Sequence, residues 1–317
     1  MQNDSQPTVT YRVISAEEDG QRLDNYLLRV LKGVPKSHIY RIVRGGEVRI
    51  NRKRAKPSSR LCIGDAIRIP PIRLSSSQIS TVSSGLSDCL LNNIIYEDEG
   101  LLVLAKPAGI AVHGGSGLSL GVIEAMRQTR TDLKYLELVH RLDKETSGCL
   151  LLAKKRSALR AVQALLEART IQKTYWALLS HPWQGKSKIL VTLPLLKSVL
   201  KSGERMVISS EEGKPAETQF TVLGQYADAC WVEALPRTGR THQIRVHAAE
   251  IGHPIVGDSK YNTQSILPSL AHLKPRMYLH ARAIQFTLNG QIYKFTAELD
   301  ASFTSALELL GGQTHRV

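Results

Sequence analysis

The chain contains 317 residues, of which 42% are hydrophobic and 22% charged, and its net charge is +14. This length is sufficient for two domains and a sizeable core. The longest apolar runs, such as 101–105, are far shorter than the roughly 20 residues of a membrane span, so we expect no transmembrane segment. The first residues lack the basic start and apolar core of a secretory signal.

The cysteines give an indication of the compartment. Cys62, Cys89, Cys149 and Cys230 are far apart in the sequence and form no C-x-x-C pair. They fit reduced thiols better than disulfides or a zinc site. The expected location is therefore the cytoplasm.

The positive charge is concentrated near the N-terminus. Residues 20–73 contain 14 Lys and Arg against three Asp and Glu, a net charge of +11. This segment carries most of the net positive charge of the chain, whereas a generally basic surface would distribute that charge evenly along the sequence. A basic segment joined to a nearly neutral remainder indicates a polyanionic partner.

The basic segment follows residues 1–19, which we expect to be a flexible lead-in. Apolar residues repeat at helical spacing over 22–31 and again between Pro35 and Gly45. Alternating residues then predict two strands, at 47–50, with a turn at 51–52, and at 66–69. Two short helices and a small sheet can place cations where they follow phosphates.

Residues 20–73 resemble the S4 RNA-binding domain. The match includes Arg22-Leu23-Asp24 at the first helix, Gly-Glu-Val-Arg-Ile-Asn at 46–51, and Asp65 before the last strand. This module binds structured RNA in ribosomal proteins and RNA-modifying enzymes, so the resemblance implies a small αL-type RNA-binding domain. The cations expected to contact RNA are Lys36, Arg41, Arg44, Arg49, Arg52, Lys53 and Arg54.

A second domain is expected over residues 94–317. Residues 74–93, which precede it, contain seven serines and few charges, a composition that predicts a linker. In the second domain strands predominate and do not alternate regularly with helices, which favours an α+β fold over a doubly wound one. The predicted strands are 101–106, 149–154, 173–180, 216–223 and 231–234, and the predicted helices are 118–128, 157–169, 241–251 and 301–310.

The most informative segment is the polar loop 140–148, which places one carboxylate, Asp143, beside Arg141. The apolar run 149–153 follows at once and predicts a buried strand that holds one end of the loop rigid. Binding and catalytic residues often lie in such loops. No second carboxylate pairs with Asp143, which argues against a two-carboxylate hydrolase.

Several separate motifs resemble those of the RluA branch of the pseudouridine synthases, and they occur in the family's order. The loop at 140–148 resembles the signature H-R-L-D-x-x-T-S-G. The resemblance covers residues 20–310, and details near 32–37 and 113–119 are similar to the RluC group, which modifies several uridines in bacterial 23S rRNA. Further matches are L-x-K-P-x-G at 104–109, K-x-Y-x-A at 173–177, T-G-R-x-H-Q-I-R-x-H at 238–247 and L-H-A at 279–281.

The resemblance implies a catalytic domain with a mixed, mainly antiparallel sheet that isomerises uridine to pseudouridine. The uracil is detached from C1′ of the ribose, turned and rejoined through C5. Asp143 is the implied nucleophile, and whether it attacks C1′ or C6 stays open. Arg245 is implied as its ion-pair partner, which favours the ionised carboxylate. Tyr175 would stack on the uracil and is a candidate for handling the C5 proton, while Leu279 would pack on the other face.

The target uridine must leave its stack before it can react. Arg141 is suited to stabilise the resulting gap, because a planar cation can stack on bases and bind phosphates. Lys106, Arg237 and Arg240 are expected to contact phosphates, and His242 is expected to bind substrate. The expected partner is 23S rRNA or a large-subunit assembly intermediate, bound by a monomer.

No metal or redox cofactor is expected, because the isomerisation neither oxidises nor hydrolyses anything. His242 and His247 are five residues apart and lack the glutamate of the H-E-x-x-H zinc motif.

A kinase and a non-catalytic RNA-binding protein are the two alternative functions for this sequence. His140–Lys144 is similar to the kinase loop H-R-D-L-K, but Leu and Asp are reversed and no D-F-G follows, so a kinase is rejected. A non-catalytic rRNA-binding or assembly factor is the second alternative. The intact Asp143, Tyr175 and Arg245 argue against it.

Overall fold

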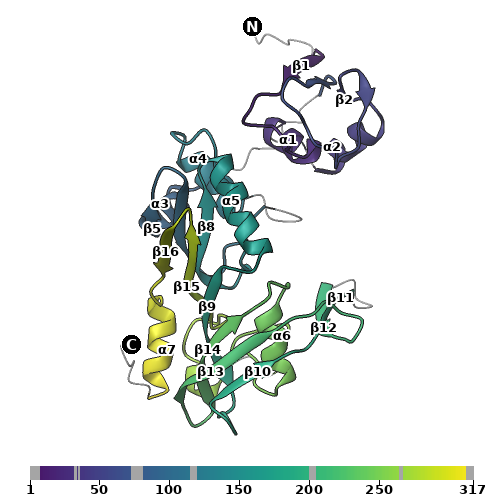
Figure 1. The fold of residues 1–317 in the computed structure, drawn as a ribbon. Coiled ribbons are helices and arrows are strands. Elements are labelled where there is room, and N and C mark those ends of the chain that lie inside the picture. The colour runs from purple at the N-terminus through teal and green to yellow at the C-terminus, as the bar shows by residue number, and fades with distance from the viewer. Residues whose placement is uncertain are drawn as a thin grey trace. The chain divides into compact units, whose positions relative to one another are not determined.

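The computed structural model describes residues 8–31, 34, 36–72, 81–114, 120–199, 205–263 and 267–311. The chain forms two compact units, 1–81 and 82–317 (Figure 1). Each unit has its own hydrophobic core.

The N-terminal unit combines two short helices with a four-stranded antiparallel sheet in the order β1-β4-β2-β3. Apolar residues of both helices and of β4 form one buried cluster, which includes Leu27, Ile42 and Ile67. This confirms the two helices and the small sheet predicted from the sequence. The elements are β1 (Thr10–Val13), α1 (Leu23–Val30), α2 (Lys36–Arg44), β2 (Arg49–Ile50), β3 (Lys53–Arg54) and β4 (Ala66–Ile69).

One part of the N-terminal prediction is wrong. β1 lies inside the segment 1–19 that was expected to be a flexible lead-in, and it pairs with β4 from Thr10 beside Ile69 to Val13 beside Ala66. A strand with all four residues exposed has no buried face, so its sequence shows no apolar alternation strong enough to reveal it. The predicted turn is confirmed, since Asn51 and Arg52 both have positive φ, as a tight two-residue hairpin loop requires.

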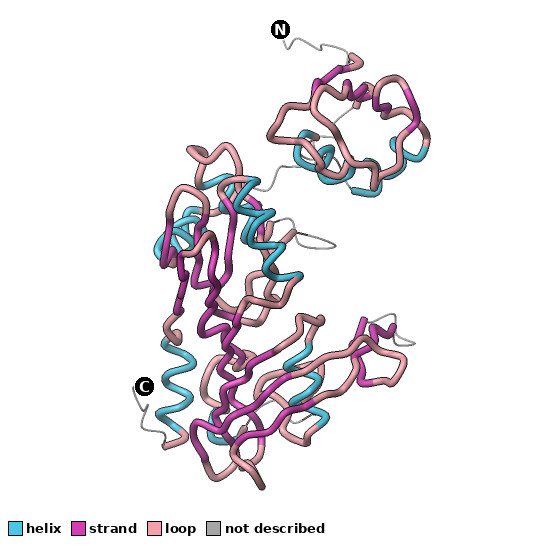
Figure 2. The backbone as a smooth tube through the Cα atoms, in the orientation of Figure 1, coloured by secondary structure: helices cyan, strands magenta, loops and turns pink. Residues whose placement is uncertain are grey.

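The C-terminal unit is built on one large mixed sheet. Its strand order is β10-β13-β14-β9-β15-β8-β6-β5, and β16 and β7 add to β15 and β8. All pairs in this sheet are antiparallel except β8 with β15, so the predicted α+β class is confirmed. Helices lie on both sides of the sheet (Figure 2). The strands are β5 (Ile94–Glu97), β6 (Leu101–Lys106), β7 (Glu137–Leu138), β8 (Ser147–Ala153), β9 (Gln172–Ser180), β10 (Lys188–Val191), β13 (Thr218–Gln225), β14 (Ala229–Pro236), β15 (Leu279–Leu288) and β16 (Gln291–Thr296).

The remaining elements are a separate hairpin and the helices that cover the sheet. The hairpin of β11 (Leu195–Val199) and β12 (Arg205–Ser209) extends away from β10 and β13 (Figure 1). The helix predicted over 118–128 begins only at Val122, because Gly121 has an extended backbone and caps it; Leu118 lies outside the described residues. The helices are α3 (Ser84–Asn92), α4 (Val122–Thr129), α5 (Arg156–Glu167), α6 (Gln243–Glu250), the 3-10 turn Pro268–Leu270 and α7 (Ala301–Leu309).

Helix α3 corrects the prediction that residues 74–93 form a linker. Ser83 caps this helix by accepting a hydrogen bond from the Leu86 backbone N–H, and Leu90 is buried in the core. The serines that suggested a linker include this cap, and a serine is a preferred residue at such a position. Residues 73–80 lie outside the described part of the chain.

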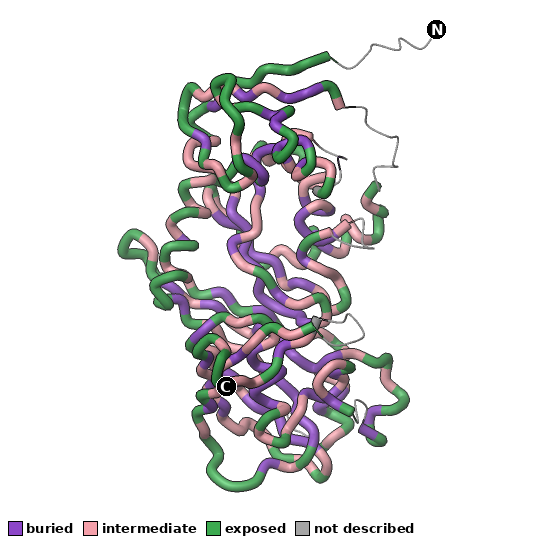
Figure 3. The backbone as a smooth tube through the Cα atoms, turned by 90° about the vertical axis from the view of Figure 1, so that its right-hand side faces the viewer, coloured by how far each residue is buried: buried purple, intermediate pink, exposed green. Residues whose placement is uncertain are grey.

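Side chains alternate between the two faces of the sheet, as the period of a strand requires. On one face, α3 and α4 cover one buried cluster and α6 covers a second. On the other face, α5 and α7 cover two further clusters. The buried backbone runs along the central strands (Figure 3). Tyr175 packs against both clusters of the first face, which puts it at the junction between the two halves of the sheet.

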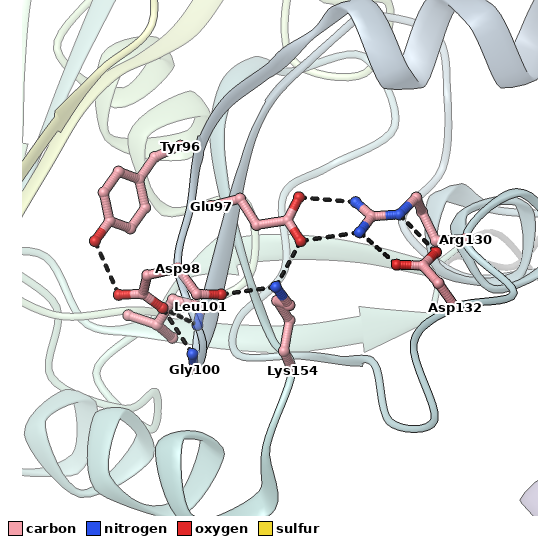
Figure 4. A network of polar contacts seen from close by, with 8 residues as sticks. All are labelled: Tyr96, Glu97, Asp98, Gly100, Leu101, Arg130, Asp132 and Lys154. Atoms are coloured by element: carbon pink, nitrogen blue, oxygen red, sulfur yellow. Dashed lines mark hydrogen bonds and ion pairs between the residues drawn. The ribbon is translucent and has the colours of Figure 1, made fainter.

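A polar network fixes the ends of β6 and β8 that are remote from the loop 140–146 (Figure 4). Lys154, directly after β8, donates to the Glu97 carboxylate and to the Asp98 carbonyl. Arg130 donates to Glu97 with both terminal nitrogens. Asp98 accepts from the backbone N–H groups of Gly100 and Leu101, which closes the turn between β5 and β6. β8 is therefore anchored at its far end while its near end carries the loop.

Candidate active site

Three neighbouring strands bring the predicted catalytic residues together. β15 pairs with β8 through Ala281 beside Gly148, and on its other side Ala281 lies beside Tyr175 of β9. The loop that carries Asp143 enters β8 at Ser147, and Leu279 begins β15. A cavity of about 520 Å³ lies at this junction, and Asp143, Tyr175, Leu279, His242 and Arg245 are among the residues that line it.

Gly148 makes the close pairing of β8 and β15 possible. Its φ is +105°, and a Cβ at this position would lie 2.2 Å from the Ala281 carbonyl oxygen. A side chain would force the two strands apart, so the last residue of the loop motif must be glycine. The motif therefore contains a packing requirement as well as the carboxylate.

Asp143 forms an ion pair with Arg245, as the motif implied. Arg245 Nη1 donates to Asp143 Oδ2 at 3.1 Å, across 102 residues of sequence. The Asp143 side chain is 25% exposed and the Arg245 side chain 8%. The carboxylate therefore has one face toward the guanidinium and another open to the cavity.

A second carboxylate, Asp258, holds the arginine from behind. It accepts from Arg245 Nε and Nη2 at 2.7 Å each, and Asp258 is 1% exposed. A bidentate pair of this kind fixes the plane of a guanidinium. Only Nη1 is then left to face Asp143. Burial disfavours the charged form of Arg245, but the hydrogen bonds and charge of Asp258, followed by the charge of Asp143, raise its pKa.

His242 lies on the same side of the cavity. Its Nε2 is 3.8 Å from Asp143 Oδ2, and its Nδ1 hydrogen-bonds to the Tyr261 hydroxyl at 2.7 Å. Burial lowers the pKa of His242, although the charge of Asp143 works in the opposite direction. The guanidinium carbon of Arg245 lies 5.0 Å from the centre of the Tyr261 ring. Tyr261 therefore supports both residues that contact Asp143.

Tyr175 and Leu279 form an apolar wall of the cavity. Burial, and then the negative charge of Asp143, raise the pKa of Tyr175, so its phenol is neutral at physiological pH. Leu279 is buried and packs in the same cluster as Tyr175. A flat ring can lie against such a wall with its edge toward Asp143.

The prediction that Lys106 contacts phosphate is wrong. Lys106 is 1% exposed, and its Nζ donates to three backbone carbonyls, those of Pro107 at 2.8 Å, Ile110 at 2.9 Å and Lys144 at 3.0 Å. Burial lowers its pKa to about 7. The ammonium group has no surface to offer to RNA. Instead it holds the carbonyl next to Asp143, and so fixes the loop from inside.

Replacing Lys106 by Met is expected to leave the Pro107 and Ile110 carbonyls without this donor, while the Lys144 carbonyl keeps the Gly109 backbone N–H. Buried unsatisfied polar groups cost roughly 1–3 kcal/mol each, so the melting temperature should fall and turnover should fall with it as the loop loosens. Thermal unfolding and kcat would be measured beside Lys155→Met, which removes a half-exposed lysine paired only at the surface. A variant of unchanged stability that binds RNA tenfold more weakly would restore the phosphate role.

The rim of the cavity is basic. Arg141 and Arg237 are exposed, and Arg240 donates through Nε to the Pro215 carbonyl. All three line the cavity, so the structure brings these predicted residues to the site. Lys173, two residues before Tyr175 on β9, also lines it, and burial lowers its pKa. We did not predict a role for Lys173, although it is the lysine of the K-x-Y-x-A motif.

Three residues of the site were missed: Asp258, Tyr261 and Lys173. No sequence motif identifies Asp258 or Tyr261. The glycine before Asp258, Gly257, is the one local feature that could have drawn attention to this turn. Its φ is +79°, and a Cβ there would collide with the Arg276 carbonyl. His247, by contrast, lies away from Asp143 and bonds to Thr218 and the Leu193 carbonyl. Among the described residues, no group of three His, Cys, Asp or Glu could hold a metal ion.

The predicted RNA-binding cations of the N-terminal unit are distributed over α2 and the β2–β3 hairpin. Arg41 and Arg44 are exposed on α2, and Arg49, Arg52, Lys53 and Arg54 are exposed on the hairpin. Lys36 begins α2, and its side chain lies outside the described residues. No helix in the described ranges is long and apolar enough to cross a membrane.

Comparisons with known proteins agree with this arrangement. The family described as RNA pseudouridylate synthase matches residues 100–250, and the S4 domain family matches residues 21–67. Ribosomal large subunit pseudouridine synthase C of Haemophilus influenzae is 50% identical over 308 residues, which are 96% of this chain and 95% of that protein. The protein of the same name from Escherichia coli K12 is 49% identical over 311 residues, 96% of this chain and 97% of its own.

A solved structure shows the same fold in the larger unit. Human RNA Pseudouridylate Synthase Domain Containing 4 superposes with a TM-score of 0.60 at 28% sequence identity, over 72% of this chain and 96% of its own. The fold and these matches define an RNA-modifying enzyme with an added S4 domain. The chain belongs to the RNA pseudouridylate synthase family, in its RluA-type branch, and its activity is the isomerisation of uridine to pseudouridine.

Proposed function

We propose that the protein converts specific uridines of 23S rRNA to pseudouridine, acting in the cytoplasm as a monomer on the rRNA or on a large-subunit assembly intermediate. The observation that carries this proposal is the near-complete alignment, at about half identity, with relatives named for the ribosomal large subunit. The S4 domain and the net charge of +11 in residues 20–73 support an RNA partner.

The proposed chemistry begins with a flipped-out uridine in the cavity beside Asp143. Asp143 attacks C1′ or C6, and the bond between C1′ and the ring nitrogen N1 breaks. The ring turns and C5 bonds to C1′, and Asp143 is released when its own bond to C1′ or to C6 breaks. Arg245 donates to the Asp143 carboxylate and keeps it aimed at the ring, because Asp258 fixes the plane of the guanidinium. N1 gains a proton, and Tyr175 is the candidate for handling the proton lost from C5: its neutral phenol would pass its own hydroxyl proton to solvent as it accepts that of C5.

The remaining assignments concern binding. Arg141, exposed at the start of the loop, would take the place of the flipped base in the RNA stack. Arg237 and Arg240 at the rim would contact the flanking phosphates, and Leu279 would pack on the uracil. His242 would bind substrate from the side of Asp143.

The function is tested by incubating the protein with unmodified large-subunit rRNA and mapping pseudouridines along it. Pseudouridine at a few positions is the expected result, with none in small-subunit rRNA treated identically. The same positions should lack pseudouridine in cells without the protein. Modification of small-subunit rRNA alone would contradict the proposed substrate, and RNA binding without modification would favour an assembly factor.

Replacing Tyr175 by Phe is expected to separate stacking from proton handling. Phe keeps the ring and therefore the affinity for RNA, while loss of the hydroxyl should lower kcat by about 10²-fold or more if it takes the C5 proton. Affinity and single-turnover rate would be compared with those of Tyr175→Leu, which also removes the ring. An unchanged rate in Tyr175→Phe would assign the proton to another group.

Removing residues 1–80 is expected to weaken binding to rRNA and to reduce its salt dependence. The slope of log K against log salt falls by about 0.7–0.9 for each phosphate contact that is lost. Residues 1–80 hold 15 Lys and Arg against seven Asp and Glu, a net charge of +8 out of +14, so several contacts should disappear. Titrations at several salt concentrations measure the slope. An identical slope in the truncated protein would place the phosphate contacts elsewhere.

A further inference from the structure

One row of residues crosses the whole sheet of the N-terminal unit. Tyr11 of β1 lies beside Arg68 of β4, Arg68 lies beside Arg49 of β2, and Arg49 lies beside Arg54 of β3. Directly opposed residues of neighbouring strands project from the same face of a sheet. The row therefore presents one aromatic ring and three guanidinium groups side by side, over about 14 Å at the usual strand spacing.

This face of the sheet is the one turned away from the core. The next row, through Ile67 and Ile50, points the other way and packs in the buried cluster of the unit. Tyr11 is 67% exposed, and Arg49 and Arg54 are exposed as well. A large exposed aromatic ring on a strand makes no contribution to the core, so its position needs another explanation.

The arginines are held in place by backbone carbonyls rather than by carboxylates. Arg68, Arg49 and Arg54 donate to the carbonyls of Glu47, Gly46 and Gly45 at 2.6, 3.2 and 3.5 Å. These carbonyls form the turn that follows α2. None of the three arginines has an Asp or Glu oxygen within 4.0 Å in the part of the chain that the structure describes. No carboxylate of the described part of the unit therefore neutralises their charge.

Gly46 makes room for this arrangement. Its φ is +74°, and a Cβ there would lie 2.6 Å from Arg54 Nε. The glycine lets the guanidinium lie against the turn. Each arginine still has unused N–H donors, because a guanidinium carries five and the structure uses one. The row is thus both positioned and available for a ligand.

We propose that this row binds a short single-stranded segment of RNA, with phosphates along Arg68, Arg49 and Arg54 and one base stacked on Tyr11. The proposal rests on the proposed function, in which RNA is the substrate. It extends the RNA-binding surface of the unit from the cations near α2 to the edge strand β1. Cationic grooves that end in aromatic platforms bind single strands, because every unpaired base offers a face for stacking.

A single strand is favoured over a duplex by the aromatic end of the row. Duplex bases are already stacked on one another, so Tyr11 could contact only the backbone of a duplex. A loop or linker of folded RNA next to the modified region has free bases. The site would therefore choose regions by their single-stranded character rather than by sequence.

The test is binding of the full-length protein to oligoadenylate of about 10 nucleotides, a length within the range that single-strand sites cover. Oligoadenylate contains no uridine, so the reaction itself cannot contribute. Tyr11→Ala is expected to weaken binding about fivefold or more without changing the salt slope, and Tyr11→Phe should bind like the wild type. The double variant Arg49→Gln/Arg54→Gln should lower the slope by about 1.4.

Arg12→Gln is the matched control. Arg12 is exposed on β1 next to Tyr11, but it pairs with Ile67 and so belongs to the opposite row. Arg12→Gln should change affinity much less than Arg49→Gln or Arg54→Gln alone, each of which also removes one charge. If Arg12→Gln and the row variants lost the same affinity for oligoadenylate, the effect would come from net charge alone and the proposal would be overturned. The proposal would also be overturned if Tyr11→Ala bound oligoadenylate with the affinity of the wild type. The same holds if Tyr11→Ala weakened binding to a duplex of the same length by the same factor.

These outcomes are independent of the proposed function. Failure of the wild-type protein to modify large-subunit rRNA would remove the proposed substrate but would leave the oligoadenylate measurements unaffected. Conversely, a row that binds no single strand would leave turnover at saturating rRNA intact. Circular dichroism of each variant confirms that the small sheet is still formed.

Discussion

Replacing Asp143 by Asn should abolish pseudouridine formation while leaving the fold and the affinity for RNA intact. Asn keeps the size of the side chain, and its amide oxygen can still accept from Arg245 Nη1. It cannot act as a carboxylate nucleophile, however, and loss of a nucleophile costs on the order of 10⁴-fold or more in kcat. Because Asp143 is 25% exposed and Arg245 keeps Asp258, stability should change by about 1 kcal/mol or less.

Release of tritium from RNA labelled at C5 of uridine measures this loss directly. Glu145→Gln is the matched control, because Glu145 is a half-exposed carboxylate in the same loop, with an ion pair to Lys144 at 3.5 Å. It should retain the wild-type rate. Turnover by Asp143→Asn above a tenth of the wild-type rate would show that another group initiates the reaction.

The sequence was sufficient to identify Asp143 and Arg245 as a pair, because both lie in motifs that resemble one family. The structure adds the distance between them and the strand pairing that produces it. The family motif at 104–109, in contrast, led to the wrong prediction that Lys106 contacts phosphate. A lysine before a proline and a glycine loop is compatible with a phosphate contact or with a buried amine bound to carbonyls. Burial depends on tertiary packing, so the sequence could not distinguish the two.

β15, which was not predicted from the sequence, has a related explanation. Its first three residues, 279–281, are buried in succession, so the alternation of apolar and polar residues begins only at Ile284. His280 and Arg282 also interrupt its apolar character. Both bond to the Ala297 carbonyl, and His280 bonds in addition to Ser147 and Arg282 to Glu298. Such compensation comes from residues on other segments, at the start of β8 and just after the end of β16. It has no local signature in the chain.

Asp258→Asn is expected to cause the largest loss of stability. Asp258 is 1% exposed and accepts from Arg245 twice and from the backbone N–H groups of Lys260 and Tyr261. An amide would turn one acceptor into a donor that faces other donors, and would leave Arg245 with Asp143 as its remaining carboxylate. Removing one partner of a buried ion pair costs roughly 3–5 kcal/mol, or about 6–20 °C for a domain of this size.

Activity should fall in the same variant for a separate reason. Without its bidentate partner the guanidinium can rotate, so Nη1 no longer stays 3.1 Å from Asp143 and the nucleophile loses its orientation. Calorimetry gives the stability, and kcat measured well below both melting temperatures isolates the positioning effect. Asp132→Asn is the control, since Asp132 is 60% exposed beside Arg130 and should cost about 1 kcal/mol or less. Reduced stability with wild-type kcat at low temperature would limit Asp258 to a structural role and would leave Arg245 correctly placed by other contacts.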